Sequence, residues 1–177
     1  THEVGHLLKN QTFAKTLRLI AQKGADIFYK GALAQRIVNK VNSVGGRPDH
    51  LSMADLASYT SKKRDPVCIF YSEWLICGMG PPSSGGLTTL QILGILDSFD
   101  LSSLMPREDG QINPIAAHLI AEASKLAFAD RNFYIADEDF ITVPTAGMLD
   151  PTYLKRRADE ISPKKAIVRA MPGNPEL

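Results

Sequence analysis

Apolar residues recur at helical spacing along most of the chain. Residues 11–23 place apolar side chains three and four positions apart, between Asn10 at the start and Gly24 at the end, which is typical of a capped amphipathic helix. The same spacing recurs in residues 32–44 and 114–135, and residues 87–99 are apolar almost all round, as expected for a buried helix. A cap at Asp150 introduces a further helix over residues 152–160. Asn113 and Asp150 stand where N-caps belong, and each precedes a proline at the first helical position. The pattern predicts a predominantly helical chain whose apolar stripes face a core.

Two shorter signals complete this set of predicted helices. Ser52 lies three residues before Asp55, a spacing that predicts a capping box at the head of a short helix ending near Tyr59. Further along, Ser162-Pro163 repeats the arrangement of a cap followed by proline and suggests another helix start.

The pattern changes to β-branched and aromatic residues between Val67 and Ile76. This change predicts one β-hairpin that turns near Ser72-Glu73. With those two turn residues, Cys68 lies directly opposite Cys77, close enough for a disulfide in oxidising surroundings. The turn lacks the Asn-Gly or Asp-Gly pair of a two-residue hairpin, so a longer loop with a shifted register remains open. The expected fold class is α+β, predominantly helical with one hairpin.

Composition restricts the class of protein. The 177 residues, 44% of them hydrophobic, can form one domain with a core. Twenty basic against nineteen acidic side chains give a net charge of +1, which argues against nucleic acid as a partner. No apolar run is long enough to predict a membrane span.

Neither the cysteines nor the histidines predict a metal or cofactor site. Two cysteines are too few for a thiolate zinc site, and His2 and His6 share the i,i+4 spacing without an HExxH frame. His118 lies off the apolar stripe of its helix and is interpreted as a surface histidine rather than a catalytic base. We therefore expect no metal, no cofactor and no catalytic residue within the chain.

The stretch GMGPPSSGG, residues 78–86, joins the hairpin to the next helix. A serine-hydrolase elbow needs glycine two positions before its nucleophile, where Ser83 and Ser84 have proline. A P-loop needs lysine and a hydroxyl residue after its second glycine, where this chain has glycine and leucine. Two interpretations of Ser83, Ser84, Gly85 and Gly86 remain: a helix start capped by a serine hydroxyl, or an anion-binding turn at the helix N-terminus.

Four blocks, in order, resemble one enzyme family. They are GADIFYKGALAQRIV, GGRPDHLSMADLASYT, GPPSSGGLTTLQILGILDSFDL and AEASKLAFADRNFYIADEDFITVP. In this order and spacing the chain resembles the γ-glutamyltranspeptidases, which are N-terminal nucleophile hydrolases. The resemblance implies that residues 1–177 are a single segment from the C-terminal half of the large subunit, part of an αββα architecture.

The resemblance also implies that the catalytic residue lies in the small subunit. In the family, a precursor cuts itself to expose a threonine at the start of the small subunit, and the freed amine can act as base for the threonine hydroxyl. The cleavage would lie beyond Leu177, so the nucleophile and most groups that bind the γ-glutamyl substrate would lie outside this chain.

The function expected from the resemblance is scaffold for the transfer or hydrolysis of γ-glutamyl groups. The partner would be the small subunit of the same precursor, in a periplasmic or extracellular location. An isolated segment should be inactive and prone to self-association through the faces that other parts of the enzyme would cover. The alternative is a freestanding helical binding module without catalytic activity.

Overall fold

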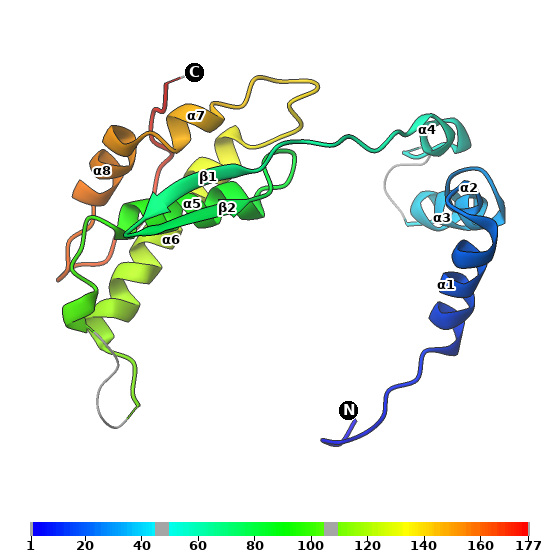
Figure 1. The fold of residues 1–177 in the computed structure, drawn as a ribbon, viewed down its shortest axis with the longest axis horizontal. Coiled ribbons are helices and arrows are strands. Elements are labelled where there is room, and N and C mark those ends of the chain that lie inside the picture. Colours follow the sequence, from blue (N-terminus) through cyan, green and yellow to red (C-terminus); the bar gives the residue numbers. More distant parts are fainter. Residues whose placement is uncertain (1, 45–49, 105–109, 177) are drawn as a thin grey trace. The chain divides into compact units, whose positions relative to one another are not determined.

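The computed structural model describes residues 2–44, 50–104 and 110–176. The chain divides into two compact units, Thr1–Lys62 and Lys63–Leu177, where composition alone predicts one domain. Figure 1 shows the elements of each unit along the colour gradient.

Four helices form the first unit: α1 (Gln11–Lys23), α2 (Asp26–Tyr29), α3 (Ala32–Asn42) and α4 (Met53–Ser58). The Asn10 side chain accepts a hydrogen bond from the Phe13 N–H at 2.9 Å, so the predicted cap is confirmed. At α4 the side chains of Ser52 and Asp55 each accept a backbone N–H of the other, and the predicted capping box is confirmed.

The prediction that the stripe on α1 faces a core is wrong. No side chain of α1 is buried, and Phe13 and Leu17 are 58% and 50% exposed. Among the described residues of this unit, the buried side chains are Ala34 and Val38 of α3. A unit of four short helices has too few layers to cover every apolar stripe.

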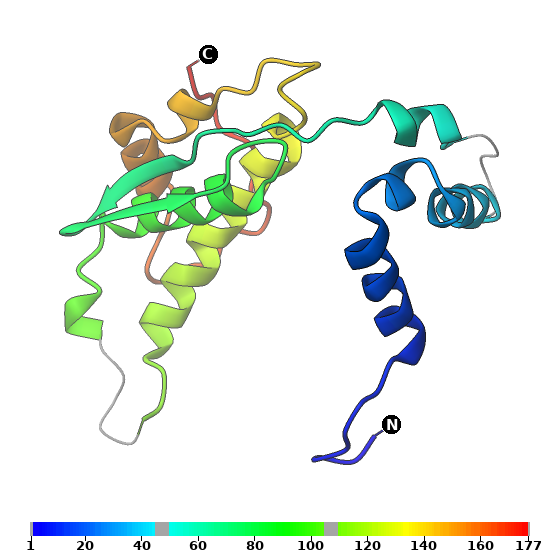
Figure 2. The same cartoon turned by 45° about the vertical axis from the view of Figure 1, so that its right-hand side comes forward.

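The second unit contains the hairpin and the longer helices. Its elements are β1 (Val67–Tyr71), β2 (Trp74–Gly78), α5 (Gly85–Leu96), a 3-10 turn (Ser102–Leu104), α6 (Pro114–Tyr134), α7 (Thr145–Met148) and α8 (Pro151–Asp159). The helix α5 is central, because it contacts both strands, α6 and α8 (Figures 1 and 2). The predicted caps of α6 and α8 are confirmed, since Asn113 accepts from Ile115 and Asp150 accepts from Tyr153.

The core of this unit lies between α5, α6 and α8. Its buried members are Ile95, Leu96, Leu119, Ala123, Leu126, Leu154, Ala158 and Ile161. Ile115 and Phe133, at the two ends of the predicted α6 stripe, are instead 47% and 69% exposed. The core thus covers the middle of α6 and leaves its ends open.

Two features differ from the sequence prediction. The helix α7 carries no signal in the sequence pattern, and it begins after Pro144. The predicted helix start at Ser162-Pro163 is wrong, because Ser162 forms an isolated bridge with Lys165 and the chain continues without a helix or strand. We call residues 162–176 the C-terminal tail.

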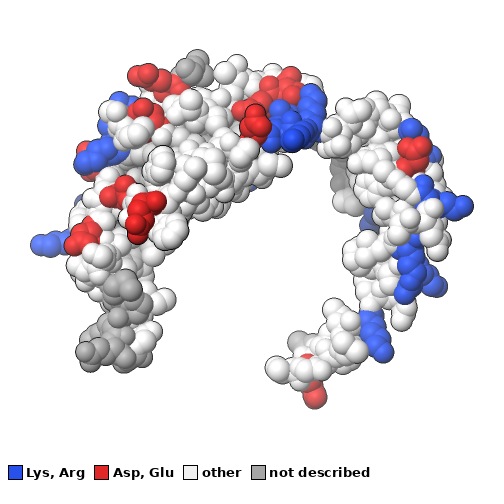
Figure 3. Space-filling model, viewed as in Figure 1, with Lys and Arg blue, Asp and Glu red and all other residues white. Residues whose placement is uncertain are grey.

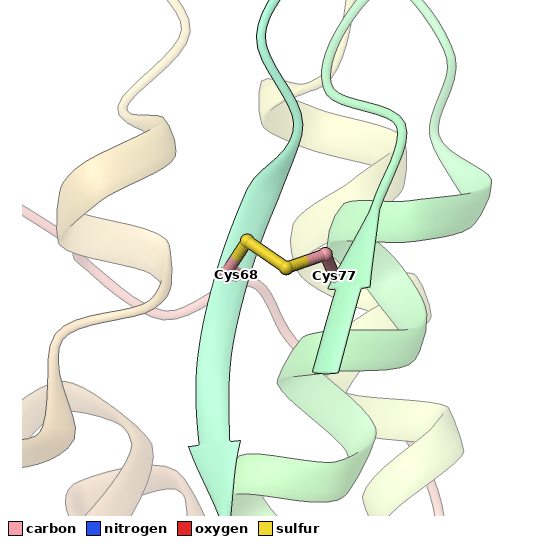
Figure 4. Close-up of a disulfide and its surroundings, with 2 residues drawn as sticks. All are labelled: Cys68 and Cys77. Carbon is pink, nitrogen blue, oxygen red and sulfur yellow. A yellow bond between two sulfur atoms is a disulfide. The ribbon is translucent and has the colours of Figure 1, made fainter. Parts of the chain in front are cut away.

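The hairpin has the predicted register. Tyr71 pairs with Trp74 across the Ser72-Glu73 turn, and Cys68 pairs with Cys77. Their Cα atoms are 4.1 Å apart and their sulfur atoms form a disulfide (Figure 4). The alternative of a longer loop with a shifted register is therefore wrong.

Reduction of this disulfide is expected to destabilise the protein by about 2 kcal/mol, because the bond closes a short loop and restricts the unfolded chain. Chemical denaturation with and without reductant measures the difference, and a variant with both cysteines replaced by serine controls for effects of the reductant elsewhere. Thiol titration of protein purified from an oxidising compartment should find no free thiol at Cys68 or Cys77. Free thiols there would contradict the bond.

Charge on the second unit is mixed. Figure 3 shows acidic and basic side chains next to one another on the face displayed, and Arg64 pairs with Asp139 at 3.1 Å and Asp137 at 3.6 Å. Among the described residues, no helix is long and apolar enough to cross a membrane.

Candidate functional site

The turn before α5 is built around a close approach of two backbone segments. A Cβ atom added to Gly86 would lie 2.3 Å from the Met79 carbonyl oxygen and 2.5 Å from the Met79 nitrogen. A Cβ added to Gly78 would lie 2.7 Å from the Gly86 Cα. The end of β2 therefore packs directly on the first turn of α5, and no side chain fits between them.

The Ser84 hydroxyl does not cap α5. Ser84 occupies the N-cap position but makes no side-chain capping hydrogen bond, so the prediction for this hydroxyl is wrong. Its φ and ψ of −86° and −19° are helical, whereas a capping residue is usually extended. The Ser84 Oγ instead accepts a hydrogen bond from Arg131 Nε at 3.1 Å, which joins the turn to α6. Ser83 is exposed, and anion binding at this turn stays a prediction.

A buried carboxylate on α6 is the centre of the polar contacts in the second unit. Asp130 is fully buried and accepts four hydrogen bonds. The donors are Gln91 Nε2 at 3.0 Å, Tyr153 Oη at 2.7 Å, Arg157 Nη2 at 3.1 Å and the Gly173 backbone N–H at 2.8 Å. Residues from α5, α6, α8 and the C-terminal tail thus meet at one side chain.

The groups around Asp130 supply hydrogen bonds and an opposite charge. The pKa of Tyr153 is raised, first by burial and then by its hydrogen bond to Asp130. The phenol therefore stays protonated and donates a hydrogen bond to the Asp130 carboxylate. Arg157, 3% exposed, supplies the opposite charge. The Nη2 atom of Arg157 also donates to the carbonyl oxygens of Leu126 at 3.1 Å and Met171 at 2.9 Å. Each of the two buried charges therefore has an oppositely charged partner.

A second buried carboxylate lies eight residues earlier on α6. Glu122 is 1% exposed and accepts from Lys125 Nζ at 2.7 Å and from the Ile167 N–H at 2.7 Å. Lys125 also donates to the Ile167 carbonyl oxygen at 3.1 Å. The main chain of the tail is therefore held at Ile167 as well as at Gly173.

Acid is expected to weaken this second contact. Burial alone would raise the pKa of Glu122, but the hydrogen bonds from Lys125 and Ile167 outweigh it and lower the pKa below its ordinary 4.5. A carboxyl whose pKa is lower in the folded state stabilises the fold above pH 4.5, and that stability is lost as the pH falls through the folded value. Glu122→Gln should therefore be less stable than the natural sequence at neutral pH, with a gap that narrows below pH 4.5. Denaturation midpoints from pH 3 to 7 measure the gap, and a gap that stays constant with pH would contradict the prediction.

The sequence prediction did not include Asp130, Glu122, Tyr153 or Arg157. One signal was present: His118 and Glu122, and again Asp130 and Tyr134, stand four residues apart, so the members of each pair are adjacent on the surface of α6. The row winds round the helix, because each step of four residues turns by about 40°. The His118 Nε2 atom lies 2.9 Å from the Ser162 carbonyl oxygen. The Tyr134 hydroxyl donates a hydrogen bond to the Gly173 carbonyl oxygen at 2.7 Å. We call this row, with Lys125, the α6 polar row.

The side-chain contacts described above join no serine, threonine or cysteine of the described residues to a histidine base. Within the described residues, no group of three or more histidine, cysteine, aspartate or glutamate side chains is placed to hold a metal ion. The α6 polar row binds backbone atoms of the same chain and so fixes where the C-terminal tail lies.

The family model described as gamma-glutamyltranspeptidase matches residues 1–175. The chain belongs to the γ-glutamyltranspeptidase family. It is 38% identical to a glutathione hydrolase proenzyme of Escherichia coli, over 92% of this chain and 27% of that protein. It is also 38% identical to the acylase ACY 1 proenzyme of Pseudomonas sp. strain SE83, over 92% of this chain and 28% of that protein. The chain thus spans little more than a quarter of these relatives.

Solved structures of γ-glutamyltranspeptidases share the fold. The Helicobacter pylori γ-glutamyltranspeptidase matches with a TM-score of 0.72 and 36% identity, over 96% of this chain and 47% of that one. A cephalosporin acylase from Bacillus halodurans matches with a TM-score of 0.73 and 30% identity, over 98% of this chain and 30% of that one. The predicted fold class, a mainly helical α+β segment of an N-terminal nucleophile hydrolase, is confirmed.

Proposed function

We propose that this chain is a scaffold segment of a γ-glutamyltranspeptidase-like enzyme that transfers or hydrolyses γ-glutamyl groups. The family match along residues 1–175 is the observation that carries the proposal. The matched relatives are longer proenzymes of glutathione hydrolase and acylase type, which supports a segment of an enzyme over a freestanding helical module.

In this proposal the catalytic threonine lies outside the 177 residues. The relatives are named proenzymes, and the chain spans 27–28% of their length. The bond that is cut during maturation follows the C-terminal tail, and the partner of the chain is the small subunit released by that cut. The contribution of this chain is to build the core of α5, α6 and α8 and to hold the tail on it.

The substrate is proposed to be a γ-glutamyl compound of glutathione type. A relative named glutathione hydrolase and a relative named acylase each share 38% sequence identity with this chain, so both substrate classes belong in the test. The apolar side chains exposed on each unit, such as Leu17 in the first and Phe70 and Trp74 in the second, also suggest that the isolated segment self-associates.

The deciding experiment compares the full precursor with the 177-residue segment. The precursor should cut itself into two chains and then hydrolyse a chromogenic γ-glutamyl anilide, and an N-acyl cephalosporin tests the acylase alternative. The isolated segment should show no turnover. Turnover by the segment alone would mean that the active site lies within it, and a precursor without either activity would contradict the proposed function.

A further inference from the structure

The C-terminal tail runs along α6 and is held there by its main chain. His118, Glu122, Asp130 and Tyr134 contact the tail in the order in which they occur along the helix. Their partners are backbone atoms of Ser162, Ile167, Gly173 and again Gly173. The tail therefore runs in the same direction as α6, and the α6 polar row fixes its register.

Because these contacts are to backbone atoms, they fix the position of the tail whatever side chains most of its residues carry. At Ile167 both backbone groups are used, since its N–H donates to Glu122 and its carbonyl accepts from Lys125. At Gly173 both are used again, by Asp130 and Tyr134. A tail shifted by one residue would leave buried charged groups without these partners.

Burial makes this register strict. Asp130 and Glu122 are 0% and 1% exposed, and Arg157, which also binds the Met171 carbonyl, is 3% exposed. Hydrogen bonds to buried charges are stronger than those at the surface, and an unpaired buried charge is costly. The tail consequently has one favourable position along α6.

The end of the tail is held by a separate contact at α7. A Cβ atom added to Gly147 would lie 1.9 Å from the Glu176 carbonyl oxygen and 2.8 Å from the Glu176 nitrogen. Pro175 is buried beside it. The backbone of the tail thus lies directly on the backbone of α7, one residue before Leu177.

We propose that Asp130 and Arg157 are positioning residues for maturation, holding the tail so that the bond after it is presented for cleavage. This inference rests on the proposed function, in which that bond lies beyond the tail. The cleavage is a hydrolysis: the peptide C–N bond breaks, the hydroxyl of a water molecule ends on the carbonyl carbon, and its proton ends on the freed nitrogen. Asp130 and Arg157 act on this step through the tail and do not touch the reacting atoms.

The test measures self-cleavage of the full precursor by loss of the uncut chain with time. Asp130→Asn keeps the shape of the side chain and removes its charge, and Gly147→Ala displaces Glu176 without changing the α6 polar row. Both variants should cleave about 10- to 100-fold more slowly, because a displacement of the scissile bond by about 1 Å has effects of this size. Cleavage of Asp130→Asn at the natural rate would overturn the proposal.

A matched control separates positioning from a general loss of stability. Leu90→Ala removes a buried side chain of α5 that lies outside the core cluster packed on the tail residues Ile167 and Ala170. All rates are taken well below the melting temperature of every variant. If Leu90→Ala cleaves normally while the two tail variants are slow, the proposal stands. If the rates of all three follow their melting temperatures, the proposal fails.

Two further outcomes are also decisive. If Asp130→Asn does not fold, Gly147→Ala decides, because it displaces the end of the tail at the separate α7 contact while Asp130 and Arg157 stay in place, and cleavage of that variant at the natural rate would overturn control by the position of the tail. If the natural precursor neither cuts itself nor hydrolyses the γ-glutamyl anilide, the proposed function fails and this inference fails with it. A natural precursor that matures and an Asp130→Asn variant that matures equally fast would overturn the positioning role alone.

Discussion

Arg157→Met is expected to lower the free energy of unfolding by about 3–5 kcal/mol, which is typical of removing one partner of a buried ion pair. The substitution leaves the Asp130 carboxylate fully buried without its cationic partner. It also removes the hydrogen bonds that Arg157 donates to the Leu126 and Met171 carbonyls. Denaturant unfolding of the full-length protein, followed by circular dichroism, measures the loss.

A double substitution tests whether the uncompensated charge is the cause. Asp130→Asn combined with Arg157→Met removes both charges and keeps a side-chain oxygen that can accept from Gln91 or Tyr153, and removing a whole buried pair costs less than breaking it. The double variant should therefore be more stable than Arg157→Met alone. A single variant within about 1 kcal/mol of the natural protein would contradict the ionised pair, since the mechanism requires at least about 3 kcal/mol.

Lys155→Met provides the matched surface control on the same helix. Lys155 pairs with Asp159, and both side chains are more than half exposed. Surface pairs of this kind contribute little, so Lys155→Met should change stability by less than about 0.5 kcal/mol. The difference in stability loss between the Arg157 and Lys155 variants then measures the effect of burying an ion pair, because both residues form one and only Arg157 is buried.

The parts of the fold that the sequence predicts well depend on neighbours within a few residues. The Asn10, Asn113 and Asp150 caps each bind a backbone N–H two or three residues away. The register of the hairpin follows from the two-residue turn, which places Cys68 opposite Cys77. Local chemistry decides these features, and the sequence contains all of it.

The Asp130 site could not be predicted in the same way. Its donors Gln91, Tyr153 and Gly173 are 39, 23 and 43 residues away, so no local pattern relates them. Their meeting depends on how α5, α6 and α8 pack, which periodicity does not specify. The spacing of polar residues along α6 indicates only that some of them are adjacent on its surface.

Ser84 illustrates the opposite difficulty. Its residue type and position favour a cap, and the structure does place it at the N-cap position. The hydroxyl is used differently because the backbone there is already helical and Arg131 lies within reach. Residue type alone therefore identifies the helix start but not the partner of the side chain.

Gly86→Ala is expected to destabilise the second unit by about 3 kcal/mol, the upper part of the usual range for overpacking. The added methyl group would lie 2.3 Å from the Met79 carbonyl oxygen and 2.7 Å from the Gly78 carbonyl carbon. Both contacts are to backbone atoms, which cannot rotate away as a flexible side chain can. Relief requires β2 to move away from α5, and denaturant unfolding measures the cost.

Gly85→Ala is the matched control, because the same atom is added one residue earlier at the start of the same helix. A Cβ at Gly85 would meet no atom within 4 Å, so this variant should be neutral or slightly more stable. Equal stability of the two variants would contradict the close approach of β2 to α5. Neither variant changes Ser83 or Ser84, so a large difference between them assigns Gly86 to the packing of β2 on α5, whatever the hydroxyls bind.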